Sequence, residues 1–303
     1  MSTPTTPANS TPAAEPHGFA LKKRRRWPWI AGIAVVAVGA AAAITIPLLN
    51  PPTSANATEG ATLVVATAEG NAAEQALVNF VAEEVAPEYG ITVEFKGLAD
   101  SNTINRAVSE GEIAGTVYQH KLWLSQVLEA NPDFKETAAV PVFRWGFGLW
   151  SDKYTSVDQV PDGGTVSLYS DPANEAQGLW LLKEAGLITL KEGTTPGTAT
   201  QDDIATNPKN LKFKELESAL LPRVLKEVDL DMINTNYALE AKLNPTKDAL
   251  VIEGADSPYV NFLVAREDNK NSDAIQKLAK ALTSPEVKAF IEKKYNGAVL
   301  PAF

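Results

Sequence analysis

Four short segments of this 303-residue chain combine amide, hydroxyl and imidazole groups with aromatic rings. The polar side chains donate and accept hydrogen bonds, and the rings offer flat apolar surface, so the combination suits the binding of a small molecule. Each segment stands where a strand is expected to give way to a helix, and open α/β sheets bind ligands at the carboxyl ends of their strands. The segments are Tyr118–Trp123, Tyr169–Asn174, Ile233–Ala238 and Ser257–Asn261.

Each segment also has a purely structural explanation. Asp171-Pro172 followed by Asn174 is a common turn and helix start, Asn234-Thr235-Asn236 is turn chemistry, and an aromatic residue after a strand is often part of the core. The binding interpretation therefore depends on the four segments taken together.

The chain offers little for catalysis. It has no cysteine and two histidines, His17 and His120, which excludes thiol chemistry, cysteine-ligated metals and a histidine-rich zinc site. It carries no P-loop, no dinucleotide-binding glycine motif, no G-x-S-x-G and no H-E-x-x-H. His120 beside Ser170 and Asp171 leaves a hydrolase as the alternative. We expect a binding protein with no catalytic residue, no metal and no cofactor.

Strand-length apolar runs alternate with helix-length segments from Ala61 onward, which indicates an α/β protein with mostly parallel sheets and two lobes. The expected strands cover residues 62–66, 91–95, 165–168, 211–213, 232–233, 250–252 and 260–265. The first expected helix carries Leu77 and Phe80 and ends at Pro87. Further helices are expected over 102–110, 122–130, 177–185 and 220–228, with two terminal helices that start at Ser272 and at Ser284-Pro285.

The N-terminal part predicts export and anchoring. Five basic residues, 22–26, precede 23 residues without charge, 27–49, and a helix of about 1.5 Å per residue over that length spans a bilayer core of roughly 30 Å. Basic flanking charge holds the preceding end in the cytoplasm. We expect a disordered cytoplasmic tail (1–21), a basic flank and transmembrane anchor (22–49), a linker (50–60) and an extracytoplasmic domain (61–303). The alternative is a signal peptide cleaved after Ala57, which would give a secreted form.

The exported domain is strongly acidic. Residues 1–60 hold five of the 27 Lys and Arg residues but two of the 37 Asp and Glu residues, so the remainder is more acidic than the net charge of −10. Nucleic acid binding requires clustered basic residues, and an anionic lipid surface repels such a domain. We therefore expect no nucleic acid partner and membrane contact through the N-terminal helix.

In its motifs the chain from about Thr62 to Phe303 resembles the NlpA-type methionine-binding lipoproteins, the substrate-binding components of methionine ABC importers. The matching motifs are Gln119-His120-Lys121, Asp171-Pro172-x-Asn174, Asn207-Pro208-Lys209-Asn210, Glu215-Leu216-Glu217, Leu221-Pro222-Arg223, Ile233-Asn234-Thr235-x-Tyr237-Ala238, Ser257-Pro258-Tyr259-Val260-Asn261 and Arg266-Glu267-Asp268-Asn269-Lys270.

The resemblance implies a two-lobed, periplasmic-binding-protein-like fold of type II. Lobe boundaries follow at 61–143 with 256–303, and at 144–255, and the chain would cross between lobes near 143–150 and 257–265. Such lobes close on a ligand and present it to a permease in the same membrane. The implied function is capture of a small amino-acid-like ligand for an ABC importer. A ligand sensor or interaction protein with the same fold and no transport role is the alternative.

The resemblance also implies which residues contact the ligand. An aromatic wall would come from Tyr118 and Trp123, and polar contacts from His120 and three asparagines. The asparagines are Asn174, Asn234 and Asn261.

Two positions of this sequence depart from the family. Gln177 stands where the family has an arginine that grips the ligand carboxylate, and Ser101 stands where the family has an aromatic residue. Glutamine can hydrogen-bond but cannot neutralise an anion. Arg144, at the expected crossing between lobes, either replaces that cation or forms an ordinary salt bridge. Our hypothesis is that the pocket takes a larger, less anionic or more cationic ligand than a plain α-amino acid.

The family is usually anchored by a lipid on an N-terminal cysteine, and this chain has no cysteine. The basic flank and uncharged segment at 22–49 are expected to take over that role.

Overall fold

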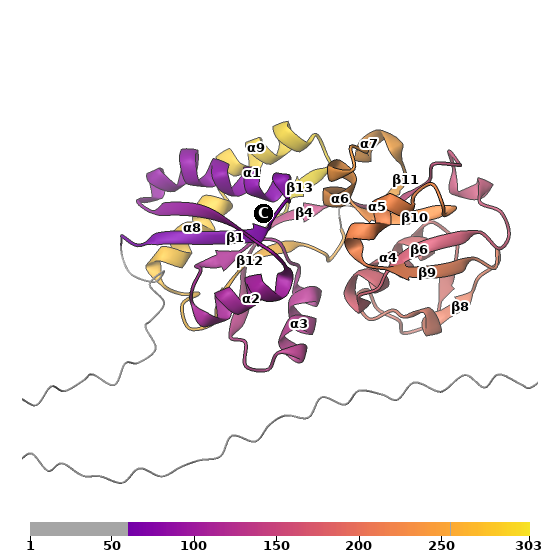
Figure 1. Ribbon diagram of the computed structural model, residues 1–303, viewed down its shortest axis with the longest axis horizontal. Helices are drawn as coiled ribbons and strands as arrows, with labels where there is room; N and C mark the ends of the chain where they lie inside the picture. Colours follow the sequence, from indigo (N-terminus) through magenta and orange to yellow (C-terminus); the bar gives the residue numbers. More distant parts are fainter. Residues whose placement is uncertain (1–59, 255) are drawn as a thin grey trace, which may run out of the picture. The chain divides into compact units, whose positions relative to one another are not determined.

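The computed structural model describes residues 60–254 and 256–303, whose strands form two large mixed sheets (Figure 1). The first sheet has the order β13 (Val299–Pro301), β4 (Glu136–Trp145), β12 (Asn261–Arg266), β3 (Gly115–Thr116), β1 (Thr62–Ala68) and β2 (Thr92–Leu98). The second has the order β11 (Ala249–Ile252), β5 (Phe147–Trp150), β10 (Leu230–Asn234), β6 (Thr165–Tyr169) and β9 (Lys212–Leu216). A small sheet pairs β7 (Thr189–Leu190) with β8 (Ile204–Thr206). We call the regions around the first and second sheets lobe 1 and lobe 2.

Helices pack against both large sheets (Figure 1). Lobe 1 contains α1 (Ala72–Phe80), α2 (Ser101–Glu110), α3 (Lys121–Ala130), α8 (Asp273–Leu282) and α9 (Pro285–Tyr295). Lobe 2 contains α4 (Pro172–Glu184), α5 (Leu221–Val224), α6 (Thr235–Glu240) and α7 (Pro245–Asp248). The Ser284-Pro285 start of α9 is confirmed, because the Ser284 hydroxyl accepts from the N–H of Val287.

Each lobe has its own apolar core. In lobe 1, Leu63 and Val65 of β1 are fully buried against Leu77 and Val81. In lobe 2, Leu168 of β6 packs in the same way in a cluster with residues of α4 and β10. Two separate cores let each lobe hold its own strand ends in place, which fixes the side chains that follow those strands.

The expectation of mostly parallel sheets is wrong. The pairs β1–β2, β1–β3, β6–β10 and β6–β9 are parallel, but β3–β12, β4–β12, β4–β13, β5–β10 and β5–β11 are antiparallel. The antiparallel strands are those next to the two connections between the lobes. The chain leaves the first sheet at Trp145, enters the second at Phe147, and returns between β11 and β12. Strands β4 and β5 carry no clear alternating pattern, since their residues 142–150 are all buried.

Three expected helix boundaries also differ from the structure. The path of α1 continues through a π-helical turn, Val81–Val85, and a 3₁₀ turn, Ala86–Tyr89, because proline fits the first turn of a helix, where its missing N–H is not needed. Helix α4 starts at Pro172 rather than at 177, and α5 ends at Val224 rather than at 228.

The predicted membrane anchor at 22–49 lies outside the described residues. Within the described residues, no helix is long and apolar enough to cross a membrane.

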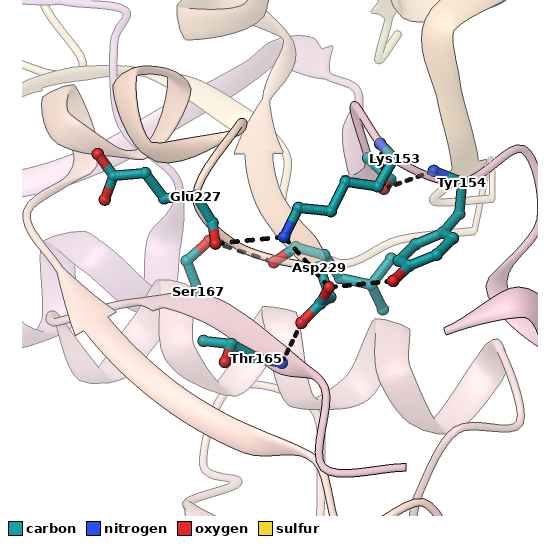
Figure 2. Close-up of polar contacts among 8 residues, drawn as sticks. Lys153, Tyr154, Thr165, Ser167, Glu227 and Asp229 are labelled. Atoms are coloured by element: carbon teal, nitrogen blue, oxygen red, sulfur yellow. Dashed lines mark hydrogen bonds and ion pairs between the residues drawn. The ribbon is translucent and has the colours of Figure 1, made fainter. Parts of the chain in front are cut away.

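Asp229, just before β10, holds together the start of β6 and the loop after β5 (Figure 2). Because β6 and β10 are parallel, this end of lobe 2 lies opposite the strand-to-helix turns. Its carboxylate accepts from the N–H of Thr165 at 2.8 Å, from Lys153 Nζ at 3.2 Å and from the hydroxyl of Tyr154 at 3.2 Å. Partial burial raises the pKa of Asp229, but these contacts outweigh it and hold that pKa below its ordinary value. The carboxylate is therefore needed in its charged form.

Replacing Asp229 by alanine is expected to lower the free energy of unfolding by about 1–2 kcal/mol at pH 7, because a backbone N–H and two side chains lose their acceptor. Urea unfolding measures this change, and Asp162→Ala, on the exposed loop before β6, is the control. The folded-state pKa is depressed, so the contribution is complete above the unfolded pKa and is lost as the pH falls through the folded pKa. Equal stability of Asp229→Ala and Asp162→Ala at pH 7 would contradict the role of Asp229.

Candidate functional site

A cavity of about 370 Å³ is lined by residues of both lobes. Its volume lies within the usual range for small-molecule sites. All eight residues predicted from the sequence line this cavity, namely Ser101, Tyr118, His120, Trp123, Asn174, Gln177, Asn234 and Asn261. Their contact with a ligand stays a prediction, but the structure brings them together.

Strand-to-helix turns build most of the cavity wall. Residue His120 is the N-cap of α3, Asp171 caps α4, and Asn234 stands at the N-cap position of α6. Residues Asn71 and Asp100 cap α1 and α2 and also line the cavity. Several helix N-termini, with their free N–H groups, thus meet at one place.

The segment at 257–261 was expected where a strand gives way to a helix, but it leads from strand β11 into strand β12. Strand β12 is antiparallel to β3, so its amino end lies beside the carboxyl end of β3. A bridge between His120 and Asn261 joins the two ends. Antiparallel pairing therefore brings this segment to the cavity that the parallel strands define.

His120 is held as a neutral ring. Its Nδ1 accepts from the backbone N–H of Trp123 at 3.2 Å, so in the neutral form the proton is on Nε2, which faces the Asn174 side-chain oxygen at 3.4 Å. Burial lowers the pKa of His120 to about 4, against a weaker raising effect of the Asn174 contact. The ring therefore acts as a hydrogen-bonding link between lobe 1 and lobe 2.

A buried amide network supports the aromatic wall. Asn105 Nδ2 donates to the carbonyl of Ser101 at 2.9 Å and to the hydroxyl of Tyr118 at 2.6 Å. The same hydroxyl accepts from Trp123 Nε1 at 3.3 Å, and Gln119 Nε2 donates to Asn105 Oδ1 at 2.6 Å. Asn105 was not predicted, because a fully buried amide in α2 cannot be recognised from sequence as the support of another helix.

The asparagines differ in how fully they are engaged. The amide of Asn174 donates to both carboxylate oxygens of Asp171, and that of Asn261 donates to the carbonyl of Tyr118 at 2.8 Å. The side chain of Asn234 makes no hydrogen bond within the described residues, while its backbone N–H donates to the hydroxyl of Tyr169. Asn234 thus keeps its amide available on the cavity wall.

The side chain of Gln177 contacts an acidic residue and not a basic one. Its Nε2 donates to Glu253 Oε2 at 2.8 Å. Burial raises the pKa of Glu253 to about 7, while Gln177 and the charge of Arg144 lower it. Arg144 does not line the cavity, so its placement favours a charge interaction with Glu253 over replacement of a ligand-binding cation.

Glu74, which was not predicted, lines the cavity from the first turn of α1 and is 2% exposed. Its Oε1 accepts from Trp145 Nε1 at 3.2 Å. Glu74 stands three, four and seven positions before Leu77, Val78 and Val81, on the buried face of the helix. A carboxylate on an apolar helix face is the signal that could have identified it.

The charged side chains on the cavity wall are acidic. Glu74, Asp100 and Glu217 line it, whereas no lysine or arginine within the described residues does. No group of three or more His, Cys, Asp or Glu residues in 60–254 and 256–303 is arranged to hold a metal ion. The site is thus organised for hydrogen bonding and aromatic contact.

Comparison with known proteins finds close relatives. A model of the NlpA lipoprotein family matches residues 63–303. The methionine-binding lipoprotein MetQ of Bacillus subtilis (strain 168) is 40% identical over 223 residues, or 73% of this chain and 81% of that protein. The D-methionine-binding lipoprotein MetQ of Escherichia coli (strain K12) is 39% identical over 73% of this chain and 82% of that protein. A nutrient-binding protein from Burkholderia cenocepacia, solved bound to methionine, is 36% identical with a TM-score of 0.72, covering 80% of this chain and 99% of that one.

The ring of His120 is expected to stay uncharged from about pH 5 to pH 8, because its pKa is about 4 in the folded protein. An NMR titration of histidine-labelled protein measures this, and His120→Gln assigns the signal. Because the folded-state pKa lies below the ordinary 6.5, the stability that this neutral ring contributes is complete above pH 6.5 and is lost toward pH 4. A ring that titrates near 6.5 would show that His120 is solvated.

Proposed function

Because the chain belongs to the NlpA lipoprotein family, we propose that it is the extracytoplasmic solute-binding protein of an ABC importer. It captures a small amino-acid-like ligand in the cavity between its lobes and delivers it to the permease. The family consists of substrate-binding proteins that are not enzymes, so His120 serves binding and not hydrolysis.

The observation that carries this proposal is the composition of the cavity wall. Lobe 1 contributes Tyr118, His120 and Trp123, and lobe 2 contributes Asn174 and Asn234. A ligand that touches residues of both lobes favours the arrangement in which the lobes are close, since each contact is made in full only there. The closed arrangement, which bound ligand favours, then presents a surface that a permease can recognise.

Two narrow connections support relative movement of the lobes. Gly146 alone separates β4 from β5, and the return runs between β11 and β12. A Cβ at position 146 would lie 2.6 Å from the hydroxyl oxygen of Thr235, which also donates to the Gly146 carbonyl. Glycine is therefore required at this crossing, where the backbone of one lobe passes close to a helix of the other.

The two MetQ proteins named above are lipoproteins, while this chain has no cysteine to carry a lipid. We infer that the segment at 22–49 anchors the domain in the membrane and that residues 50–60 are the linker between anchor and domain. Tethering keeps the domain at a high effective concentration near a permease in the same membrane.

The anchor predicts that the full-length protein stays in the membrane fraction after an alkaline carbonate wash and retains residues before Ala57. Fractionation with mass spectrometry of the mature N-terminus measures this. Soluble protein that begins at Thr58 would instead establish cleavage of a signal peptide.

Ligand binding is expected to need the aromatic wall and the available amide. Calorimetric titration of the full-length protein with L-methionine, and with its decarboxylated analogue 3-(methylsulfanyl)propan-1-amine, should give saturable one-to-one binding of at least one probe. Trp123→Ala and Asn234→Ala should each weaken it roughly tenfold or more, through lost apolar contact and a lost hydrogen bond respectively.

Trp180→Ala is the matched control, because Trp180 lies on α4 but does not line the cavity. The proposal fails if neither probe binds to folded protein, or if Trp123→Ala binds as tightly as Trp180→Ala.

A further inference from the structure

One carboxylate oxygen on the cavity wall has no partner. Glu74 Oε1 accepts from Trp145, whereas Glu74 Oε2 is buried and makes no hydrogen bond of ordinary geometry within the described residues, although the side chains of Thr67 and Asn71 lie near enough to lower the pKa of Glu74. A buried carboxylate oxygen that is left unpaired costs more free energy than almost any other polar atom. Its position beside a cavity leaves it open to a partner from outside the chain.

Two further buried acceptors of the same wall are unpartnered, the side-chain oxygens of Gln119 and Asn236. The orientation of Gln119 follows from its neighbours. The carbonyl of Ser101 can only accept, so it fixes Asn105 Nδ2 as the donor, and Asn105 Oδ1 must then accept from Gln119 Nε2. The hydrogen bonds of the network therefore fix the orientation of the Gln119 amide, and its oxygen has no donor.

Many donors of the wall are, by contrast, already engaged. Amide groups of Asn174, Gln177 and Asn261 each donate to an oxygen of the protein, and so do the indoles of Trp123 and Trp145. The remaining donors include the amides of Asn234 and Asn236 and the unpartnered hydroxyl of Tyr259, and all of them are neutral. A ligand carboxylate would meet no cation in the wall and three acidic side chains, Glu74, Asp100 and Glu217.

We propose that the ligand of this cavity carries a protonated amine that binds to Glu74 and lacks a free carboxylate. This inference rests on the proposed solute-binding function and names its substrate class as small organic amines with an apolar tail. The tail lies against the aromatic wall, where Tyr118, Trp123 and Trp145 also favour a cation over an anion.

The protonation of Glu74 fits this assignment. Burial raises its pKa to about 8, the bond from Trp145 lowers it, the charge of Glu240 on α6 raises it again, and contacts with the side chains of Thr67 and Asn71 lower it. The other titratable groups that interact with Glu74 are the hydroxyls of Tyr118, Tyr237 and Tyr295, none of which supplies a positive charge. Glu74 is thus mostly neutral at pH 7 in the empty cavity and ionises when a cation arrives.

Three probes share the methylsulfanyl side chain of methionine and differ in their charged groups. L-Methionine carries both an amine and a carboxylate, 3-(methylsulfanyl)propan-1-amine carries the amine alone, and 4-(methylsulfanyl)butanoate carries the carboxylate alone. Calorimetry on the full-length protein at pH 7 should rank the amine first, at least tenfold tighter than L-methionine, and the butanoate last.

Glu74→Gln keeps the shape of the side chain and an acceptor for Trp145 but cannot ionise. This variant should bind the amine roughly 10- to 100-fold more weakly, because a charge-assisted hydrogen bond is lost. The ratio of the affinities for the amine and for L-methionine should fall as well. Glu83→Gln is the matched control, since Glu83 follows on the same helical segment and is exposed. Near-UV circular dichroism verifies the fold of both variants.

The outcomes separate this inference from the function on which it rests. L-Methionine binding as tightly as the amine, or amine binding that survives Glu74→Gln, overturns the inference and leaves the solute-binding function standing. Binding of none of the three probes to folded protein overturns both.

A second measurement needs no variant and applies if Glu74→Gln does not fold. Titration of the wild-type protein with the amine in phosphate and in Tris at pH 7 gives the number of protons exchanged. Release of close to one proton is expected, because a group of pKa about 8 becomes charged. Absence of proton release would overturn the assignment of Glu74.

Discussion

The site depends on one constraint, that the polar ends of strands and helices must be satisfied where they meet. Strands β1 to β3 of lobe 1 and β6 and β10 of lobe 2 end at the same cavity, and each leads into a helix whose first N–H groups need acceptors. Side-chain caps such as His120 and Asp171 supply those acceptors and are thereby fixed in direction. The residues that line the cavity are therefore positioned by the same hydrogen bonds that start the helices, and the two apolar cores hold those turns in place.

Much of this arrangement can be predicted from the sequence, because caps and turns are local signals. Asp171-Pro172 with Asn174, and Asn234 before Thr235, mark helix starts directly after apolar strands, and the structure places Asn174 and Asn234 on the cavity wall. The antiparallel strands β4 and β5 could not be predicted, since buried strands at a crossing show no alternation. Glu74 escaped notice because a glutamate in the first turn of a helix is ordinarily a solvated, dipole-stabilising residue. Its burial against Trp145 depends on tertiary packing, and so does the hydrogen bond that Asn105 donates to Tyr118.

Desolvation sets the electrostatic character of the binding domain. The domain is acidic overall, yet the buried acids Glu74, Asp231 and Glu253 have pKa values raised to about 8, 8 and 7. Of these, Glu74 lines the cavity. It takes its charged form when a cation comes near and a neutral form otherwise, so the cavity discriminates by charge without a permanent buried anion. Gln177, at the position where the resemblance implies an arginine, donates to Glu253 and adds no cation to the cavity wall.

Identification of the molecule that the protein carries tests the central claim most directly. The full-length protein is purified without added ligand, denatured, and its released small molecules are quantified by mass spectrometry beside those of Asn234→Ala. The account predicts a small amine released in close to equimolar amount from the wild type and in much smaller amount from the variant. A released ligand that carries a free carboxylate, with or without an amine, or equal release from both proteins, would contradict it.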